Sequence, residues 1–482
     1  MTLALKPQEK KLLKDISSFA KNKKIKLYLV GGYLRDSILE RKKTNPDIDF
    51  CIKKEAINFG RKLQKRIGAG FVVLDKEHGC CRLVKRMDGR VYTLDFTDFR
   101  GKTLEEDLKY RDFTINALAL ELEKIFTRPN LNHSLIDPYR ARKDLKSGLI
   151  RITNKKSFDD DPLRILRAFS LAAIFAFKID KETMKLIRLK KKKLSGVSFE
   201  RIRDELFKIL DSSCAYEYLA ALDKLKILKI IIPEAEPMRG VNQGPYHHLD
   251  VLKHSLETVR QIELIIEGFK KNREIHAYLN EIISGERKRR SLMKLGAFLH
   301  DIGKPRALRR KAGKTIFHGH ERIGAELADN IARRLRLSND ESKTLGKMVF
   351  WHLRPGYLAD VEEVTPRAKF RYFRDTAGEA VSTLLISLAD QRSTKGPLTT
   401  KASRLRHEKI VLTLIKEYFR EKKKRKLPRL ITGDDLIRKF KLQPSPLIGK
   451  ILSEIEELQA IGKIKTKKQA LERAGKLKGG GR

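Results

Sequence analysis

Two acidic residues near the start of the chain, Asp47 and Asp49 in the stretch PDIDF, are separated by a single residue. Residues two apart in a β-strand face the same side, so both carboxylates would lie together. Neighbouring carboxylates repel unless a cation lies between them, and Mg²⁺ prefers such oxygen ligands. Two ions ~3.5 to 4 Å apart would stabilise the attacking and leaving oxygens of a phosphoryl transfer. Taken alone, however, this pattern is also common on solvated strand edges.

A glycine turn precedes the aspartate pair, in the stretch LVGGYLRD. A strand that ends in Gly31 and Gly32 leaves no side chain in the way, so backbone N–H groups can approach a phosphate chain. A helix expected to begin near Tyr33 would point its N-terminus at that charge, where Arg35 could pair with phosphate oxygens. An ordinary strand-to-helix turn is the alternative for two glycines alone. Together with the aspartate pair, the turn indicates nucleotidyl transfer.

These residues belong to an N-terminal region that carries most of the β signal. Short, turn-bounded runs rich in β-branched and aromatic residues predict strands at KLYLVGG, DIDFCI, GFVVLD, CCRLVKR and RVYTLDFTDF. From about residue 155 onward, apolar residues recur three and four positions apart, and this period continues almost to the end. The sequence therefore predicts an α+β region followed by an all-α region.

The charge balance indicates the class of partner. The chain has 482 residues and a net charge of +45, from 106 Lys and Arg against 61 Asp and Glu. Such an excess favours a polyanion, by default nucleic acid. No apolar run approaches the ~18 residues of a spanning helix, which argues against a membrane partner. The N-terminus has no signal-peptide pattern and the four cysteines have no disulfide or metal spacing, so a cytoplasmic location is expected.

Several motifs in fixed order resemble the CCA-adding and bacterial poly(A) polymerase family of template-independent nucleotidyltransferases. They are LVGGYLRD, PDIDF, LEEDLKYRDFTINALAL (104–120), LIDPYRARKDL (135–145) and DDDPLRILRAFSLAAIFAF (159–177). The resemblance implies a polymerase-β-like head with a mixed sheet and Mg²⁺ bound in it. The implied reaction is attack of an RNA 3′-hydroxyl on the α-phosphorus of ATP or CTP, with release of pyrophosphate.

The resemblance also implies roles for single residues. Asp47 and Asp49 would be catalytic and hold the metal ions, and Asp95 in YTLDF would be either a third carboxylate or a structural aspartate. The residues implied to line the nucleotide site are Gly31, Gly32, Arg35, Arg111, Asp112 and Asn116.

The stretch DDDPLRILRAF could recognise the incoming base. On a helix beginning near Pro162, Asp161 and Arg164 share a face with Arg167. An aspartate accepts and an arginine donates, so together they could pair with a base edge. In the family, this pair selects cytosine or adenine without a template. The alternative is a helix-start aspartate with an ordinary salt bridge. The family's usual first glutamate is Asp160 here.

The connection before the RDFTINA motif is short in this chain. Family members that add all of CCA usually carry a longer polar loop there, whereas this chain has DFRGKTL. The short connection leaves addition of CCA, of CC or of the final A open.

A second group of histidines and aspartates lies in the middle of the chain. The order H…HD…H…H…D, with the string HDIGK, resembles the HD-superfamily metal phosphohydrolases. Imidazole and carboxylate are apt ligands for a divalent transition metal or Mg²⁺. The implied ligands are His254, His300, Asp301 and Asp390, with His320 and His352 serving a second ion or a substrate phosphate.

An active site of this kind would direct a metal-bound water at a phosphate ester, such as a 2′,3′-cyclic phosphate or a phosphorylated RNA end. A fold that has lost its metal is the alternative. His247, His248 and His318 are expected to be incidental.

Dense basic runs occur at KLIRLKKKKL (185–194) and EKKKRK (421–426). Charge of this kind binds RNA phosphates without reading sequence, although a single run is usually a solvated helix face. We expect an N-terminal head at residues 1–150, a helical RNA-binding neck at 151–235, an HD domain at 236–400 and a helical tRNA-binding body at 401–482.

These observations favour addition of C and A to the 3′ end of tRNA. Addition of poly(A) to other RNA 3′ ends, an RNA-end phosphohydrolase whose head only delivers RNA, and a noncatalytic RNA-binding or chaperone protein are the alternatives. The sequence leaves the oligomeric state open.

Overall fold

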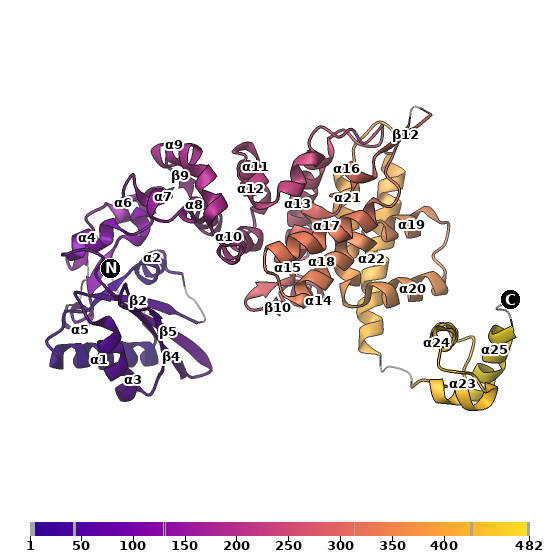
Figure 1. Cartoon of the computed structure of the whole chain (residues 1–482), viewed down its shortest axis with the longest axis horizontal. Helices are drawn as coiled ribbons and strands as arrows, with labels where there is room; N and C mark the ends of the chain where they lie inside the picture. Colours follow the sequence, from indigo (N-terminus) through magenta and orange to yellow (C-terminus); the bar gives the residue numbers. More distant parts are fainter. Residues whose placement is uncertain are drawn as a thin grey trace. The chain divides into compact units, whose positions relative to one another are not determined.

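The computed structural model describes residues 5–41, 45–128, 130, 132–312, 314–424 and 428–479. The chain divides into two compact units, Met1–Lys208 and Ile209–Arg482, and each is described by itself. Figure 1 labels their helices and strands.

A seven-stranded mixed sheet forms the centre of the first unit, in the order β3-β4-β5-β2-β1-β6-β7. β2 and β5 run parallel, and every other pair of neighbours is antiparallel. The predicted mixed sheet is therefore confirmed. The strands are β1 (Tyr28–Val30), β2 (Asp47–Ile52), β3 (Gly70–Asp75), β4 (Cys80–Met87), β5 (Arg90–Asp98), β6 (Ala119–Glu121) and β7 (Leu135–Ile136).

Aromatic side chains attach two helices, α1 (Pro7–Asn22) and α3 (Ala56–Ile67), to one face of this sheet. Phe50 of β2 stacks on Phe96 of β5 with ring centroids 4.7 Å apart, and Phe59 of α3 lies 5.4 Å from Phe96. Phe19 of α1 lies 5.4 Å from Phe59. Because side chains alternate along a strand, Asp47 and Asp49 point to the opposite face from Phe50.

The rest of the first unit is mainly helical. Its further helices are α2 (Gly32–Ile38), α4 (Leu104–Lys109), α5 (Lys124–Thr127), α6 (Ala141–Ser147), α7 (Ser157–Asp160), α8 (Arg164–Phe175) and α9 (Lys181–Lys190), and α10 (Phe199–Asp211) continues beyond it. α8 begins later than the predicted start near Pro162. Asp161 has φ −149° and ψ 101°, because a residue before proline avoids the helical conformation.

The second unit is built from helices that pack through apolar faces. α13 packs against α15 and α21, and α17 packs against α18. The helices are α11 (Ala215–Lys224), α12 (Leu228–Ile231), α13 (Val251–Gly268), α14 (Arg273–Leu279), α15 (Arg289–Leu299), α16 (Lys304–Ala307), α17 (His320–Arg334), α18 (Asn339–Trp351), α19 (Arg354–Asp360), α20 (Pro366–Thr376), α21 (Ala380–Ser393) and α22 (Lys401–Lys423).

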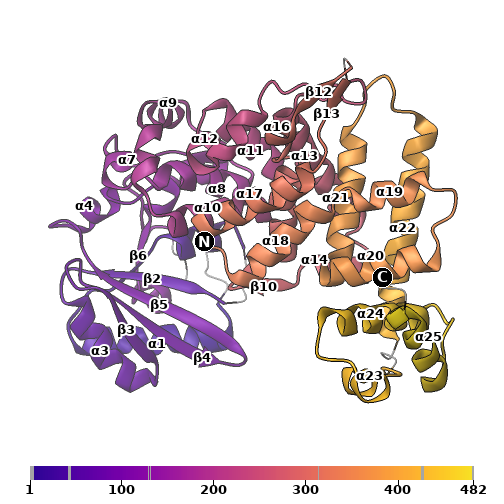
Figure 2. The same cartoon turned by 45° about the vertical axis from the view of Figure 1, so that its right-hand side comes forward.

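Three C-terminal helices, α23 (Gly433–Phe440), α24 (Pro446–Ala460) and α25 (Lys467–Gly479), share an apolar core of their own (Figure 2). Within the described ranges, no helix combines the length and apolarity needed to cross a bilayer.

Three small two-stranded sheets interrupt the helical region and were not predicted. They pair β8 (Leu149–Ile150) with β9 (Lys178–Ile179), β10 (Ile282–Ser284) with β11 (Arg287–Lys288), and β12 (Arg309–Lys311) with β13 (Lys314–Ile316). Strands of two or three residues are too short to show an alternating pattern. The expected α+β head followed by helical regions is otherwise confirmed.

Candidate functional site

Three carboxylates lie together on one face of the head sheet. Asp49 on β2 pairs with Val30 across β1 and with Asp95 across β5. Asp47 lies two residues before Asp49 and therefore points the same way. The structure thus brings together the three residues proposed as catalytic, next to the end of β1.

Asp95 differs from the other two carboxylates because an arginine holds it. Arg82 on β4 donates from Nε and Nη2 to the two carboxylate oxygens of Asp95, both at 2.8 Å. This bidentate ion pair fixes the orientation of Asp95. Arg82 was not among the predicted site residues, because only the pairing of β4 with β5 places it opposite Asp95.

The electrostatics of Asp49 favour a bound cation. Burial raises the pKa of its carboxyl, and Asp95 and Asp47 raise it further. Arg111 and Arg167 lower this pKa without cancelling the rise. A carboxylate that is desolvated and faces like charges gains strongly from a nearby cation. The group is suited to hold a divalent metal.

Gly31 stands where the glycine turn meets the aspartate pair. Its φ is +72°, a conformation that side chains disfavour. A β-carbon at this position would lie 3.0 Å from both Oδ2 of Asp49 and Nη1 of Arg111. Glycine is therefore needed for the backbone conformation and for the close approach of both side chains.

We expect Gly31→Ala to lower nucleotide addition by about 10²-fold, because a displacement of ~1 Å at a reacting centre has effects of this size. The control is Gly89→Ala, since Gly89 has φ +68° and an added β-carbon there would meet no atom within 4 Å. Both substitutions strain the backbone by about 1 to 3 kcal/mol. Steady-state rates and thermal unfolding of both variants check this, and equal activity losses would contradict a specific role for Gly31.

Arg111 lies against the aspartate pair and keeps an unused donor. Its Nη2 lies 3.4 Å from Asp107, while its Nε is buried without a hydrogen-bond partner. Burial would lower the pKa of its guanidinium, but Asp107, Cys51 and Asp49 outweigh burial and raise it. Arg111 is therefore a permanent cation beside the carboxylates, with a donor that an anionic ligand could accept from.

Three other predicted nucleotide residues, Arg35, Asp112 and Asn116, form a buried network that the exposed Arg167 joins. Arg35 donates to Asp36 at 2.9 and 2.8 Å and to Asn116 at 2.6 Å. Asn116 in turn donates to Asp112 at 2.9 Å, and Arg167 lies 2.9 Å from the other oxygen of Asp112. These contacts hold each side chain in one orientation beside the carboxylates.

Charge pairing keeps this network ionised. Burial would raise the pKa of the Asp112 carboxyl, but Arg167, the hydrogen bonds from Asn116 and Phe113, and Arg164 hold it below the usual range. The guanidinium of Arg35 also lies 4.5 Å from the ring centroid of Phe175, a cation–π contact. Asp36 and Phe175 were not predicted as site residues.

Asp161 and Arg164 each have other partners. Arg164 donates to Oγ of Ser157 at 2.9 Å and to the backbone oxygen of Tyr110 at 2.8 Å. Asp161 pairs with Arg201 of α10 at 2.7 Å. The two side chains come from neighbouring positions, but both are held by groups that the sequence did not indicate.

The second unit brings together all six predicted metal ligands, which we call the HD group. They form two triads, one of His254, His300 and Asp390 and one of Asp301, His320 and His352, in each of which ligand atoms lie within 4.8 Å of one another. The helices α13, α15, α17, α18 and α21 supply them, from within these helices or directly at their ends.

Asp301 joins the two triads through its two oxygens. Oδ2 lies 3.2 Å from Nε2 of His300, and Oδ1 lies 3.3 Å from Nε2 of His320 and 3.7 Å from Nε2 of His352. Nε2 of His254 lies 2.9 Å from Asp390. The arrangement is that of a carboxylate able to bridge two neighbouring cations.

Backbone oxygens orient three of the histidines. Nδ1 of His300 contacts the oxygen of Ala297 at 2.8 Å, and His320 and His352 make the equivalent contacts three residues back at 2.8 and 2.6 Å. A proton on each Nδ1 leaves Nε2 free to bind a metal. Nε2 of His300 is buried without a hydrogen bond, so the residues fit a divalent ion.

Burial and neighbouring charges shift the pKa values of several members of the HD group. Burial would lower the pKa of His300, but Asp301 and Asp390 raise it to about 10. Burial, His300 and His320 lower the pKa of His352 to about 3. The pKa values of Asp301 and Asp390 lie well below their usual range, because the histidine contacts outweigh burial.

Two residues beside the HD group were not predicted from the sequence. Lys304 lies 2.6 Å from Asp301 and donates to Gln243 at 2.7 Å. Its spacing of three from Asp301 was the available signal. His247, expected to be incidental, lies with its ring centroid 4.8 Å from that of His254 and has a buried Nδ1 without a partner.

The structure describes the first of the two basic runs in full and the second only in part. Lys190 and Lys193 at the first run pair with Asp159 at 2.9 and 2.7 Å, so part of that charge is neutralised within the fold. The second run, 421–426, extends into 425–427, which lie outside the described residues.

Four family models match successive parts of the chain. The Poly A polymerase head domain matches residues 27–151, and the HD domain matches residues 251–395. The "Probable RNA and SrmB- binding site of polymerase A" matches residues 176–239, and tRNA nucleotidyltransferase domain 2 matches residues 404–474.

Similar proteins extend over almost the whole chain. The A-adding tRNA nucleotidyltransferase of Deinococcus radiodurans is 30% identical over 445 residues, which cover 90% of this chain and 91% of that protein. The CC-adding tRNA nucleotidyltransferase of Synechocystis sp. is 27% identical, with 89% and 88% covered. The Thermotoga maritima CCA-adding enzyme, solved as a complex with tRNA, has the same fold, with a TM-score of 0.62, 22% identity and 98% and 96% covered.

Proposed function

Because the chain belongs to the family of tRNA nucleotidyltransferases and poly(A) polymerases, we propose that it adds C and A nucleotides to the 3′ end of tRNA without a nucleic-acid template. The enzyme is a nucleotidyltransferase that uses CTP and ATP. The observation that supports this most strongly is the convergence of Asp47 and Asp49 with Gly31 and Arg111 at the end of β1.

In the proposed reaction Asp47 and Asp49 would hold Mg²⁺, which would supply charge stabilisation at the reacting phosphorus. The N–H groups at Gly31 and Gly32 face the phosphate chain, and Nε of Arg111 donates to one of its oxygens. Asp95, held by Arg82, completes the acidic face. These groups orient the α-phosphorus toward the RNA 3′-hydroxyl and balance the charge that develops on pyrophosphate.

The network of Arg35, Asn116 and Asp112 would contact the sugar and base of the nucleotide, while the carboxylates and Arg111 contact its phosphates. Its contacts fix Asp112 and Arg167, whose remaining donors and acceptors would contact the sugar and base. Arg35 acts here mainly by positioning Asn116. Asp161 and Arg164 would read the base edge once their contacts to Arg201 and Ser157 rearrange.

One assay tests this function and its extent. tRNA ending before CCA, after the first C and after the second C is incubated with Mg²⁺ and with CTP, ATP or both, and the 3′ ends are sequenced. The proposal expects incorporation limited to CCA, CC or the final A. Long adenine tracts on an unstructured RNA primer would instead identify a poly(A) polymerase.

We further propose that the HD group is a metal-dependent phosphohydrolase site for RNA ends. It is supported by two histidine-carboxylate triads joined through Asp301, which suit a transition metal or Mg²⁺. The metal would supply an activated water. Lys304 and His247 lie where they could contact a phosphate group.

The division into head, neck, HD domain and body at residues 150, 235 and 400 remains our proposal for how these sites are carried. The body would hold tRNA through phosphates and shape. The four cysteines are free thiols, which supports a reducing compartment such as the cytoplasm.

A further inference from the structure

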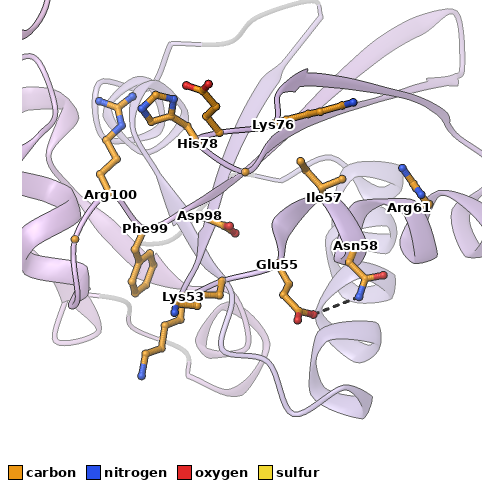
Figure 3. Close-up of a pocket in the computed structure, with 14 residues that line it drawn as sticks. Lys53, Glu55, Ile57, Asn58, Arg61, Lys76, His78, Asp98, Phe99 and Arg100 are labelled. Atoms are coloured by element: carbon orange, nitrogen blue, oxygen red, sulfur yellow. Dashed lines mark hydrogen bonds between the residues drawn. The ribbon is translucent and has the colours of Figure 1, made fainter.

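A hollow of about 840 Å³ lies at the head, and Asp47, Asp49 and Asp95 are not among the residues that line it (Figure 3). Three segments of the first unit line it: the end of β2 with the start of α3, the turn between β3 and β4, and the residues that follow β5. It belongs to neither site described above.

The lining of this hollow carries basic side chains whose charge the fold leaves uncompensated. Lys53, Lys54 and Lys76 are exposed, and no ion pair to them occurs within the described ranges. Arg61 lies over the ring of Phe71 at 5.8 Å, and Nη1 of Arg100 donates to the backbone oxygen of Tyr110 at 3.4 Å.

Two of the three acidic side chains of the lining, Asp98 and Glu55, have local hydrogen bonds, and the third, Glu77, is exposed. Asp98 accepts a hydrogen bond from the backbone N–H of Ala56 at 2.7 Å and thereby caps α3. Glu55 accepts from Asn58 at 3.2 Å. The lining thus carries five Lys and Arg side chains against three carboxylates, and its lysines are exposed.

The cations surround the hollow instead of converging on one point. In Figure 3, Arg100 lies on one side, Lys76 and Arg61 on another, and Lys53 on a third. A single compact anion is bound best by donors that converge on it. Cations spread around an open hollow suit a chain of phosphates.

The hollow and the carboxylates lie toward opposite ends of β2. This strand carries Asp47 and Asp49 at its start, and Lys53 directly follows its end at Ile52. At ~3.3 Å per residue, Lys53 lies about 13 Å along the strand direction from Asp49. An RNA strand whose 3′ end is at the carboxylates can span this distance.

We propose that this hollow binds backbone phosphates of the RNA substrate upstream of its 3′ end. The inference rests on the proposed function, since it takes RNA as the substrate of the head. Binding is electrostatic and independent of sequence, because lysines contact phosphates as point charges. The hollow would thus raise RNA affinity without taking part in the chemistry.

The test replaces the three lysines together, as Lys53→Ala/Lys54→Ala/Lys76→Ala. The matched control is Lys10→Ala/Lys62→Ala/Lys65→Ala, which removes the same charge from exposed positions of the same head outside the hollow. The affinity for tRNA is measured between 50 and 200 mM salt, together with kcat and the KM for CTP and ATP.

We expect the hollow variant to bind tRNA roughly tenfold more weakly at ~0.1 M salt, with the slope of log K against log salt reduced by about 2 to 3. The KM for nucleotide and kcat at saturating tRNA should stay unchanged. Equal losses in the control variant, or a raised KM for nucleotide with unchanged tRNA affinity, would overturn the proposal. The tRNA used for binding ends where the wild-type protein begins addition; if the wild-type protein extends none of the tRNAs ending before CCA, after the first C or after the second C, the proposed function is wrong instead.

Discussion

Asp49→Asn is expected to reduce nucleotide addition by about 10³-fold or more, which corresponds to several kcal/mol of lost transition-state stabilisation. The amide keeps the size of the carboxylate but removes the charge that would hold the metal. Burial raises the pKa of the Asp49 carboxyl, and Asp95 and Asp47 raise it further, so its charged form gains strongly from a bound cation. The loss should appear in kcat, measured by single-turnover extension of tRNA, while tRNA affinity stays unchanged.

The control for this substitution is Asp88→Asn, in the exposed turn between β4 and β5. Asp95→Asn should have a smaller effect than Asp49→Asn. Both oxygens of Asp95 already accept hydrogen bonds from Arg82, so Asp95 is less available to bind a metal ion. If Asp49→Asn extends tRNA at the rate of the Asp88→Asn control, the carboxylates do not carry the reaction.

Asp301→Asn is expected to abolish hydrolysis by the HD group, with a loss of about 10³-fold or more, because this carboxylate joins both ligand triads. The activity is measured on RNA ending in a 2′,3′-cyclic phosphate after loading with Mg²⁺, Mn²⁺, Co²⁺ or Ni²⁺, and bound metal is measured by elemental analysis. Nucleotide addition to tRNA should continue unchanged.

Removing the charge of Asp301 also leaves Lys304 buried without its partner, which can cost about 3 to 5 kcal/mol of stability. A second variant, Asp390→Asn, removes a ligand that is partly exposed and pairs with His254. The control is His318→Asn, at an exposed position outside both triads. Retained metal and hydrolysis in both aspartate variants would contradict the HD proposal.

The sequence allowed the acidic face of the head to be predicted because strand alternation is a local property. Asp47 and Asp49 had to share a face once PDIDF was recognised as a strand. The neighbour of Asp49 across β5 depends on a parallel pairing between distant strands, so Asp95 rested on resemblance alone. Arg82 depends on a further pairing and gave no signal.

Long-range contacts also determine what the arginines of the head do. Arg35 lies in the glycine motif, but its partner Asn116 is 81 residues away, so the sequence could not show that the two form one network. Its predicted place at the triphosphate stays a prediction. Asp161 is extended because it precedes a proline, and Pro162 and Leu163 form a turn that leads into α8 at Arg164.

In the HD region, residue types and order were sufficient to find all six members of the two triads. The connection between the triads was not predictable, since it depends on how Asp301 divides its oxygens between His300 and His320. His247 was set aside because a histidine in a turn-rich stretch carries no spacing signal. Its proximity to His254 depends on the packing of that stretch against α13.

The most direct test of the central claim is a crystal structure with Mn²⁺ in place of Mg²⁺ and a non-reactive CTP or ATP analogue. The account predicts anomalous density for Mn²⁺ bonded to Asp47 and Asp49, with the triphosphate against Gly31 and Arg111. Metal and triphosphate bound elsewhere, with both aspartates turned away from them, would contradict it.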